Sequence, residues 1–453
     1  MVFLPVVRSY SLGLDFFNVA IMSAFVKEVE FVKKLEFKKK SKLKISARQR
    51  PDWLSSNPGG HPRDHSEPGT CSPPQDKCWV FLLAFTSSHS YDDVFATRNS
   101  VSIQALLNVE HPIIQAPMAG ACTPALVAAV SNGGGLGSLG AAPMKPDVLR
   151  AQIQKIRALT ERPFNINLFA PASERFDADA MPGKAARALL EKYHQELGLG
   201  ELPAPSGIFG PAEQQLEVLL EEKVPVISFH FGVAAHHVNA IHAAGLKVIC
   251  SATTIEEAVH LESLGCDAVI AQGSEAGGHR GTFMGDFQRA LIGTMALVPQ
   301  IVDAVSVPVI AAGGIMDARG IVACKALGAS GVQMGTAFLG CPESGIPDVW
   351  REQLKASSPS RTTVTTVMSG KPARGLANRY IQDMEALEEA PMPYPLQYAL
   401  SGAIRKKAAQ QGNPDFLAMW SGQGVGMLQE LPAAELLKAL VTQTRLLLAE
   451  LAK

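Results

Sequence analysis

The sequence has almost no net charge. Its 41 lysine and arginine residues are balanced by 42 aspartate and glutamate residues, which gives a formal net charge of −1. Without an excess of positive charge, the chain has no global field to attract phosphate backbones, so nucleic acid is a poor default partner. The 47% hydrophobic and 18% charged residues are instead typical of a globular protein that buries a sizeable core.

A long uninterrupted hydrophobic run is also absent. The longest apolar stretch, residues 12–26, is interrupted by Asp15 and Asn18, and it falls short of the roughly 18–20 residues that cross a bilayer. No cleavage site typical of a secretory signal peptide follows it. We therefore expect no membrane span and a cytoplasmic protein, with organelle targeting by the N-terminal extension as the alternative.

Cysteines in paired positions are lacking as well. The spacing of the seven cysteines forms neither a disulfide framework nor a CxxC zinc pattern. This spacing indicates a reducing compartment, and we predict no metal site. The cysteines are Cys71, Cys78, Cys122, Cys250, Cys266, Cys324 and Cys341.

The first hundred residues differ in composition from the rest. Residues 27–50 hold ten basic and three acidic side chains, and residues 51–77 are rich in proline, glycine and serine. Such segments bury too little apolar surface to offset the conformational entropy that folding costs. We predict that residues 1–100 form a poorly structured extension, with a basic amphipathic helix over residues 27–50 as the alternative.

After residue 110, short apolar runs alternate with segments of helical periodicity. This alternation predicts repeated βα units on a parallel sheet, and eight such strands close into a TIM (β/α)8 barrel. We place the barrel at residues 101–341, with an insertion at 170–223, and expect residues 342–453 to form a helical region that completes a lid over the barrel. The eight expected strands are residues 112–118, 136–140, 164–169, 224–231, 247–251, 268–272, 307–312 and 332–334.

Unusual residues gather where the later strands end, which is where such barrels place their ligands. The sixth strand is followed by a glycine-rich loop, residues 273–281, that contains His279. Glycines also follow the seventh strand, at Gly313 and Gly314, and the eighth, at Gly335. Backbone amides at glycines can approach a phosphate closely, so we predict a phosphate-binding end of the site here.

If the phosphate belongs to FMN, two further features of the sequence are explained. Residues 116–120 (APMAG) offer small side chains against which a flat isoalloxazine ring could lie. Asn167 and Gln272, at the ends of two strands, offer amides for ring heteroatoms. His279 suits proton abstraction if its pKa is near neutral, and His230 is a second candidate, for which a core role is equally compatible.

Five motifs in sequence order resemble the nitronate monooxygenase family, formerly called 2-nitropropane dioxygenases. They are QAPMAG (115–120), NINLF (165–169), AQGSEAGGHRG (271–281), AAGG (311–314) and QMGT (333–336). The resemblance implies a TIM barrel that holds non-covalent FMN, with His279 as the base or as the group that binds the nitro or nitronate moiety. The FMN contacts that it implies are Met118, Ala119, Asn167, Ser251, Gln272, Gly277, Gly278, Gly313, Gly314, Met334, Gly335 and Thr336.

The resemblance also implies a reaction. An alkyl nitronate, such as propionate 3-nitronate, is oxidised with O2 to a carbonyl compound, and nitrite or nitrate is released. The partners are then small molecules, and a homodimer is compatible with the family. Two alternatives stay open: an FMN-dependent enoyl-acyl-carrier-protein reductase, which has a similar EAGGH loop, and a non-catalytic flavin-binding interaction protein.

Overall fold

The computed structural model describes residues 102–170, 181–204 and 211–453. The extension expected at residues 1–100, with its basic segment, lies outside these described residues. Among the helices that are described, none is long and apolar enough to cross a membrane.

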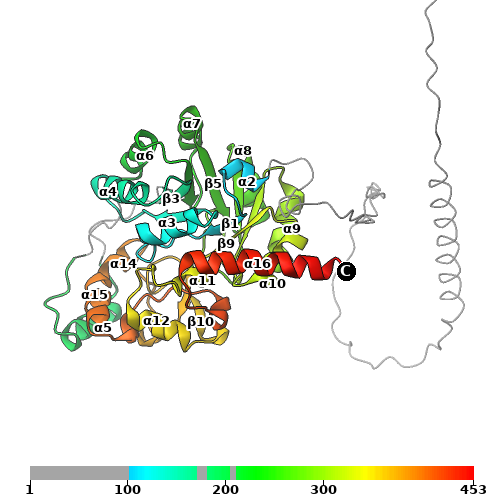
Figure 1. Cartoon of the computed structure of the whole chain (residues 1–453). Coiled ribbons are helices and arrows are strands. Elements are labelled where there is room, and N and C mark those ends of the chain that lie inside the picture. Colours follow the sequence, from blue (N-terminus) through cyan, green and yellow to red (C-terminus); the bar gives the residue numbers. More distant parts are fainter. Residues whose placement is uncertain (1–101, 171–180, 205–210) are drawn as a thin grey trace, which may run out of the picture. The chain divides into compact units, whose positions relative to one another are not determined.

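Eight parallel strands form the barrel that the sequence predicts (Figure 1). Their hydrogen-bonded order is β1-β9-β8-β6-β5-β4-β3-β2, and a parallel bridge between Ile114 and Leu136 closes the ring. The strands are β1 (Ile113–Gln115), β2 (Gly137–Gly140), β3 (Phe164–Phe169), β4 (Val226–His230), β5 (Lys247–Ala252), β6 (Ala268–Gln272), β8 (Val309–Ala312) and β9 (Gly331–Met334).

Helices follow the strands and cover the outside of the barrel. Several begin at a side-chain cap, as at Thr123, Thr254 and Asp317, whose oxygens accept hydrogen bonds from backbone amides of the first turn. The helices are α3 (Pro124–Asn132), α4 (Pro146–Arg157), α6 (Ala212–Glu221), α7 (Ala235–Ala243), α8 (Ile255–Ser263), α9 (Thr294–Ala304) and α10 (Ala318–Ala326).

Alternation along the strands divides the apolar side chains of the barrel between two cores. Ile113 packs in the large cluster between strands and helices, whereas its neighbour Ile114 packs in a cluster that fills the barrel interior. Helix α2 (Ile103–Leu107) adds Ile103 and Leu107 to this interior cluster. Residues that precede the first strand therefore contribute to the barrel core.

A third core lies in a cap built from the insertion and the C-terminal region. Helix α5 (Lys184–Glu196) supplies Leu190 and Tyr193, which pack with Tyr380 and Phe416. The other elements are α11 (Thr336–Leu339), α12 (Asp348–Lys355), η2 (Pro359–Arg361), β10 (Thr362–Thr365), β11 (Ala373–Leu376), α13 (Arg379–Glu385), α14 (Leu396–Leu400), α15 (Gly402–Gln410), η3 (Pro414–Phe416) and η4 (Gln423–Met427).

The C-terminal region differs from the expected helical lid in two respects. It contains β10 and β11, which form an antiparallel sheet with the short strand β7 (Gly278–His279). The last helix, α16 (Ala433–Leu451), packs on the barrel beside α3 and α10 (Figure 1). Its Leu436, Leu437 and Leu440 belong to the core between strands and helices, so α16 is a barrel helix and not part of the cap.

Candidate active site

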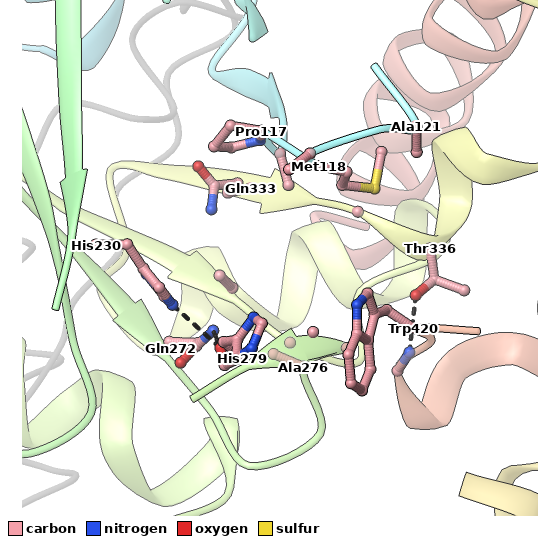
Figure 2. Close-up of a pocket in the computed structure, with 18 of the residues that line it drawn as sticks. Pro117, Met118, Ala121, His230, Gln272, Ala276, His279, Gln333, Thr336 and Trp420 are labelled. Atoms are coloured by element: carbon pink, nitrogen blue, oxygen red, sulfur yellow. Dashed lines mark hydrogen bonds between the residues drawn. The ribbon is translucent and has the colours of Figure 1, made fainter. Parts of the chain in front are cut away.

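A pocket opens at the carboxyl ends of the barrel strands, beneath the cap. Its volume of about 330 Å³ lies within the range of small-molecule sites, roughly 300–1,000 Å³. In Figure 2, His230, Gln272 and His279 lie together, and Met118 lies on the other side of the pocket. The pocket is therefore built from strand ends that lie far apart in the sequence.

One part of the pocket wall is formed by glycines. Gly313 and Gly314 have φ angles of 112° and 72°, which side-chain-bearing residues rarely adopt. Within the described part of the chain, their backbone amides donate no hydrogen bond. Together with Gly335 they line the pocket, so this wall offers donors to an anion and leaves space for it.

A segment from the cap closes against the glycine-rich loop. A Cβ atom on Gly277 would lie 2.5 Å from the Gly422 nitrogen, so only glycine allows this approach. The Gly422 amide donates to Thr336 Oγ1 at 2.9 Å, and the Gln423 amide donates to the Glu275 carbonyl at 2.9 Å. These contacts bring Trp420 to the edge of the pocket (Figure 2).

Buried polar contacts fix the loop after β1. Gln115 Oε1 accepts from the Ser138 amide at 2.9 Å, and Cys122 Sγ accepts from the Met118 amide at 3.0 Å. Burial raises the pKa of the Cys122 thiol to about 11, so it stays protonated and serves as a hydrogen-bonding anchor. Met118 and Ala119 are thereby fixed at the pocket wall.

His279 lies on strand β7, where pairing with Ala373 of β11 fixes its backbone. Its carbonyl accepts from Gln272 Nε2 at 3.0 Å and from His230 Nε2 at 3.1 Å. Its own Nε2 lies 3.0 Å from Ser369 Oγ. Contacts from the barrel thus fix the main chain of His279, and a hydroxyl from the cap orients its ring.

Aromatic rings surround this histidine. The ring centroids of Tyr394 and Trp420 lie 5.4 Å from that of His279, and Phe231 lies at 6.0 Å. Phe231 adopts a φ of 69°, a strained backbone conformation that often occurs at functional sites. The glycine-rich loop therefore does not leave the His279 ring open, because aromatic side chains from other segments crowd it.

Burial, and to a smaller extent the neighbouring His230 and the Lys371 charge, lower the pKa of the His279 imidazole to about 3. The near-neutral pKa expected from the sequence is not found, because the half-buried ring has a desolvated, largely aromatic surrounding. An uncharged imidazole with so low a pKa is a weak base, and it can still donate or accept a hydrogen bond.

His230 is uncharged as well, since burial lowers its pKa to about 4. Its Nε2 contacts the carbonyl of His279, which only accepts, so Nε2 carries the proton. Its Nδ1 then accepts from Ser251 Oγ at 2.6 Å. His230 lines the pocket, but its hydrogen bonds point to a positioning role toward His279.

The two side-chain amides proposed to contact flavin heteroatoms differ in how many of their atoms already form hydrogen bonds within the protein. Gln272 uses both ends of its amide, because Oε1 also accepts from the Gly281 amide at 2.8 Å. Asn167 donates its Nδ2 to Ser228 Oγ at 3.0 Å. Gln272 therefore mainly orders the loop that carries His279, and Asn167 retains its Oδ1.

The pocket brings together His279 and all but one of the residues predicted to contact the cofactor. The exception is Met334, whose side chain is 1% exposed and packs in the core between strands and helices. Side chains alternate along β9, so Gln333 faces the pocket instead. Two tyrosines of the cap, Tyr394 and Tyr398, also line the pocket, whereas Tyr380 is buried in the cap core.

The chain matches a known protein family. The family model for nitronate monooxygenase matches residues 100–443. A nitronate monooxygenase from Pseudomonas aeruginosa is 47% identical over 345 residues, which cover 75% of this chain and 98% of that protein.

Two solved structures are also similar. A nitroalkane oxidase from Streptomyces ansochromogenes is 40% identical with a TM-score of 0.68, covering 75% of this chain and 98% of that one. FabK from Thermotoga maritima is 32% identical with a TM-score of 0.60, covering 77% of this chain and 97% of that one.

Proposed function

Because the chain belongs to the nitronate monooxygenase family, we propose that it is an FMN-dependent monooxygenase of alkyl nitronates. It uses O2 to oxidise substrates such as propionate 3-nitronate to carbonyl compounds, with release of nitrite or nitrate. The family match spans the whole described pocket, from the loop after β1 to the segment around Trp420.

The observation that carries the choice of substrate is the place of His279, whose imidazole lies at the pocket wall among aromatic rings. A nitronate has already lost its α-proton, so its oxidation needs hydrogen-bonding groups for the nitro oxygens and no strong base. A neutral nitroalkane must first lose that proton, and a base with a pKa of about 3 is poorly matched to this step near pH 7. The site therefore favours nitronates over neutral nitroalkanes.

The residues of the pocket fit FMN. The open amides of Gly313 and Gly314, with Gly335 and Thr336 beside them, would hold the phosphate. The backbone around Met118 and Ala119 would support the ring. When bound, FMN supplies the redox chemistry; the chain binds and orients the substrate and excludes water.

The test is aerobic turnover of propionate 3-nitronate by the FMN-loaded protein, followed as oxygen uptake with and without NADH. We expect uptake that needs no NADH and that exceeds the rate with the corresponding neutral nitroalkane. His279→Ala should lower kcat/KM for the nitronate, because it removes the imidazole at the pocket wall. Equal rates on the two substrates in the unaltered protein would contradict the role assigned to His279.

The enoyl-acyl-carrier-protein reductase is the second candidate, because the loop around His279 resembles the reductase loop. It predicts consumption of NADH with an enoyl thioester and no oxygen uptake on nitronates. Flavin binding without either reaction would support the non-catalytic alternative.

A further inference from the structure

Three metal-ligating side chains meet at the N-terminal ends of α6 and α7, which lie side by side (Figure 1). Glu213 lies in the first turn of α6, and His236 and His237 are consecutive residues at the start of α7. Glu213 Oε1 lies 2.8 Å from His237 Nε2 and 3.5 Å from His236 Nε2. Within the described ranges this is the one group of three such residues whose ligand atoms all lie within 4.8 Å of one another.

The geometry of the two histidines brings their nitrogens together. Neighbouring residues on a helix usually point in different directions, yet these ring centroids are only 4.1 Å apart and both Nε2 atoms face the same carboxylate. The His237 ring is 1% exposed and stacks on Phe229 of β4, with centroids 5.7 Å apart and an interplanar angle of 8°. The buried His237 ring is thus rigidly placed, whereas the exposed side chains of Glu213 and His236 can adjust.

Two imidazoles and one carboxylate are a donor set for borderline divalent cations such as Zn²⁺, whereas Mg²⁺ and Ca²⁺ prefer oxygen ligands alone. We propose that Glu213, His236 and His237 form a surface site for such a cation, with a fourth position open to water. The site is separate from the pocket, because none of the three residues lines it, and the proposal does not depend on the reaction catalysed there.

The surroundings of His237 also limit the affinity of the proposed site for the cation. His237 Nδ1 is buried and has no hydrogen-bond partner, whereas a ligating histidine usually donates its second ring N–H to an acceptor. Loss of such a partner weakens metal binding by about 10- to 100-fold. The cation is therefore bound reversibly and more weakly than in a closed structural zinc site.

Isothermal titration of the FMN-loaded, full-length protein with ZnCl2 tests the proposal. His236→Ala and Glu213→Gln alter side chains that are 70% and 61% exposed, so both variants should fold normally. Other histidines and cysteines of the chain can bind zinc, so the informative quantity is the difference between variants. We expect each variant to lose one equivalent of zinc, or to bind that equivalent at least about tenfold more weakly.

His242→Ala is the matched control. His242 lies on the same helix and pairs with Asp267 at 3.0 Å, but it is not part of the three-residue group. This variant should keep the zinc stoichiometry of the unaltered protein. Isotherms of His236→Ala and Glu213→Gln that match the unaltered protein would overturn the proposal, as would loss of the same equivalent in His242→Ala.

Discussion

At the scale of single residues, the site is ordered by hydrogen bonds whose direction is fixed by carbonyl groups. The carbonyl of His279 can only accept, so it determines the protonated nitrogen of His230, and Ser251 then donates to the other nitrogen. Ser369 has one hydroxyl proton and two acceptors, His279 Nε2 and the Lys371 carbonyl, both at 3.0 Å. The choice between them sets which nitrogen of His279 carries a proton.

Ser369→Ala tests this role. Ser369 is fully buried and does not line the pocket, so we expect normal FMN content. Loss of one hydrogen bond, roughly 0.5–1.5 kcal/mol, should lower kcat for the nitronate by about 2- to 12-fold with little change in KM. Steady-state kinetics measure kcat and KM separately. Ser369→Thr should restore activity because threonine keeps the hydroxyl. Ser360→Ala, at an exposed position, is the control.

The low pKa values of the two histidines also predict a pH dependence of stability. In the folded protein the pKa is about 4 for His230 and about 3 for His279, against the usual 6.5. Between about pH 6.5 and 4 the unfolded chain binds protons that the folded chain does not. The two histidines therefore make their full contribution to the free energy of unfolding above pH 6.5, and this contribution is lost as the pH falls.

His230→Asn and His279→Asn should each remove about one such proton. The slope of unfolding free energy against pH would then become shallower by up to about 1.4 kcal/mol per pH unit. Urea unfolding between pH 4.5 and 7 measures the slope. An unaltered slope in both variants would show that the two histidines have the same pKa in the folded and the unfolded chain.

At the scale of elements, apolar periodicity predicted the barrel and could not predict the contacts that complete the site. Several barrel strands are runs of mostly apolar residues in sequence, such as AVIAQ at β6, so local pattern is sufficient for them. Strand β7 is only Gly278 and His279, and it exists because it pairs with β11. Local pattern does not predict the place of Trp420 at the pocket, since this depends on long-range packing of residues 421–422 against Gly277.

Gly277→Ala tests the contact between the glycine-rich loop and this segment. The added Cβ would lie 2.5 Å from the Gly422 nitrogen and the Ser421 carbonyl carbon, so the segment must shift away from the pocket. We expect reduced FMN content after purification and weaker FMN binding, measured by flavin fluorescence. Gly426→Ala is the matched control, because its Cβ would meet only Pro359 Cδ at 3.7 Å.

At the scale of the whole molecule, the order of the sequence does not follow the division between barrel and cap. Part of the insertion, α6, covers the barrel, while α5 belongs to the cap core. The chain then leaves the cap and returns in α16, whose leucines pack between α3 and α10. Helical periodicity predicted α16 itself, but an amphipathic pattern does not specify which surface a helix will cover.

The last prediction concerns the residue at which the catalytic unit begins. A shortened chain that begins at Val101 should fold, bind FMN and oxidise the nitronate as the full chain does, because the barrel, the cap and the pocket are built from later residues. A chain that begins at Asn108 lacks α2, and with it Ile103 and Leu107 of the barrel interior. Burial of two such side chains contributes about 3–6 kcal/mol, so the midpoint of urea unfolding should fall clearly in this second chain. Loss of FMN or of folding in the chain that starts at Val101 would show that the first hundred residues support the barrel.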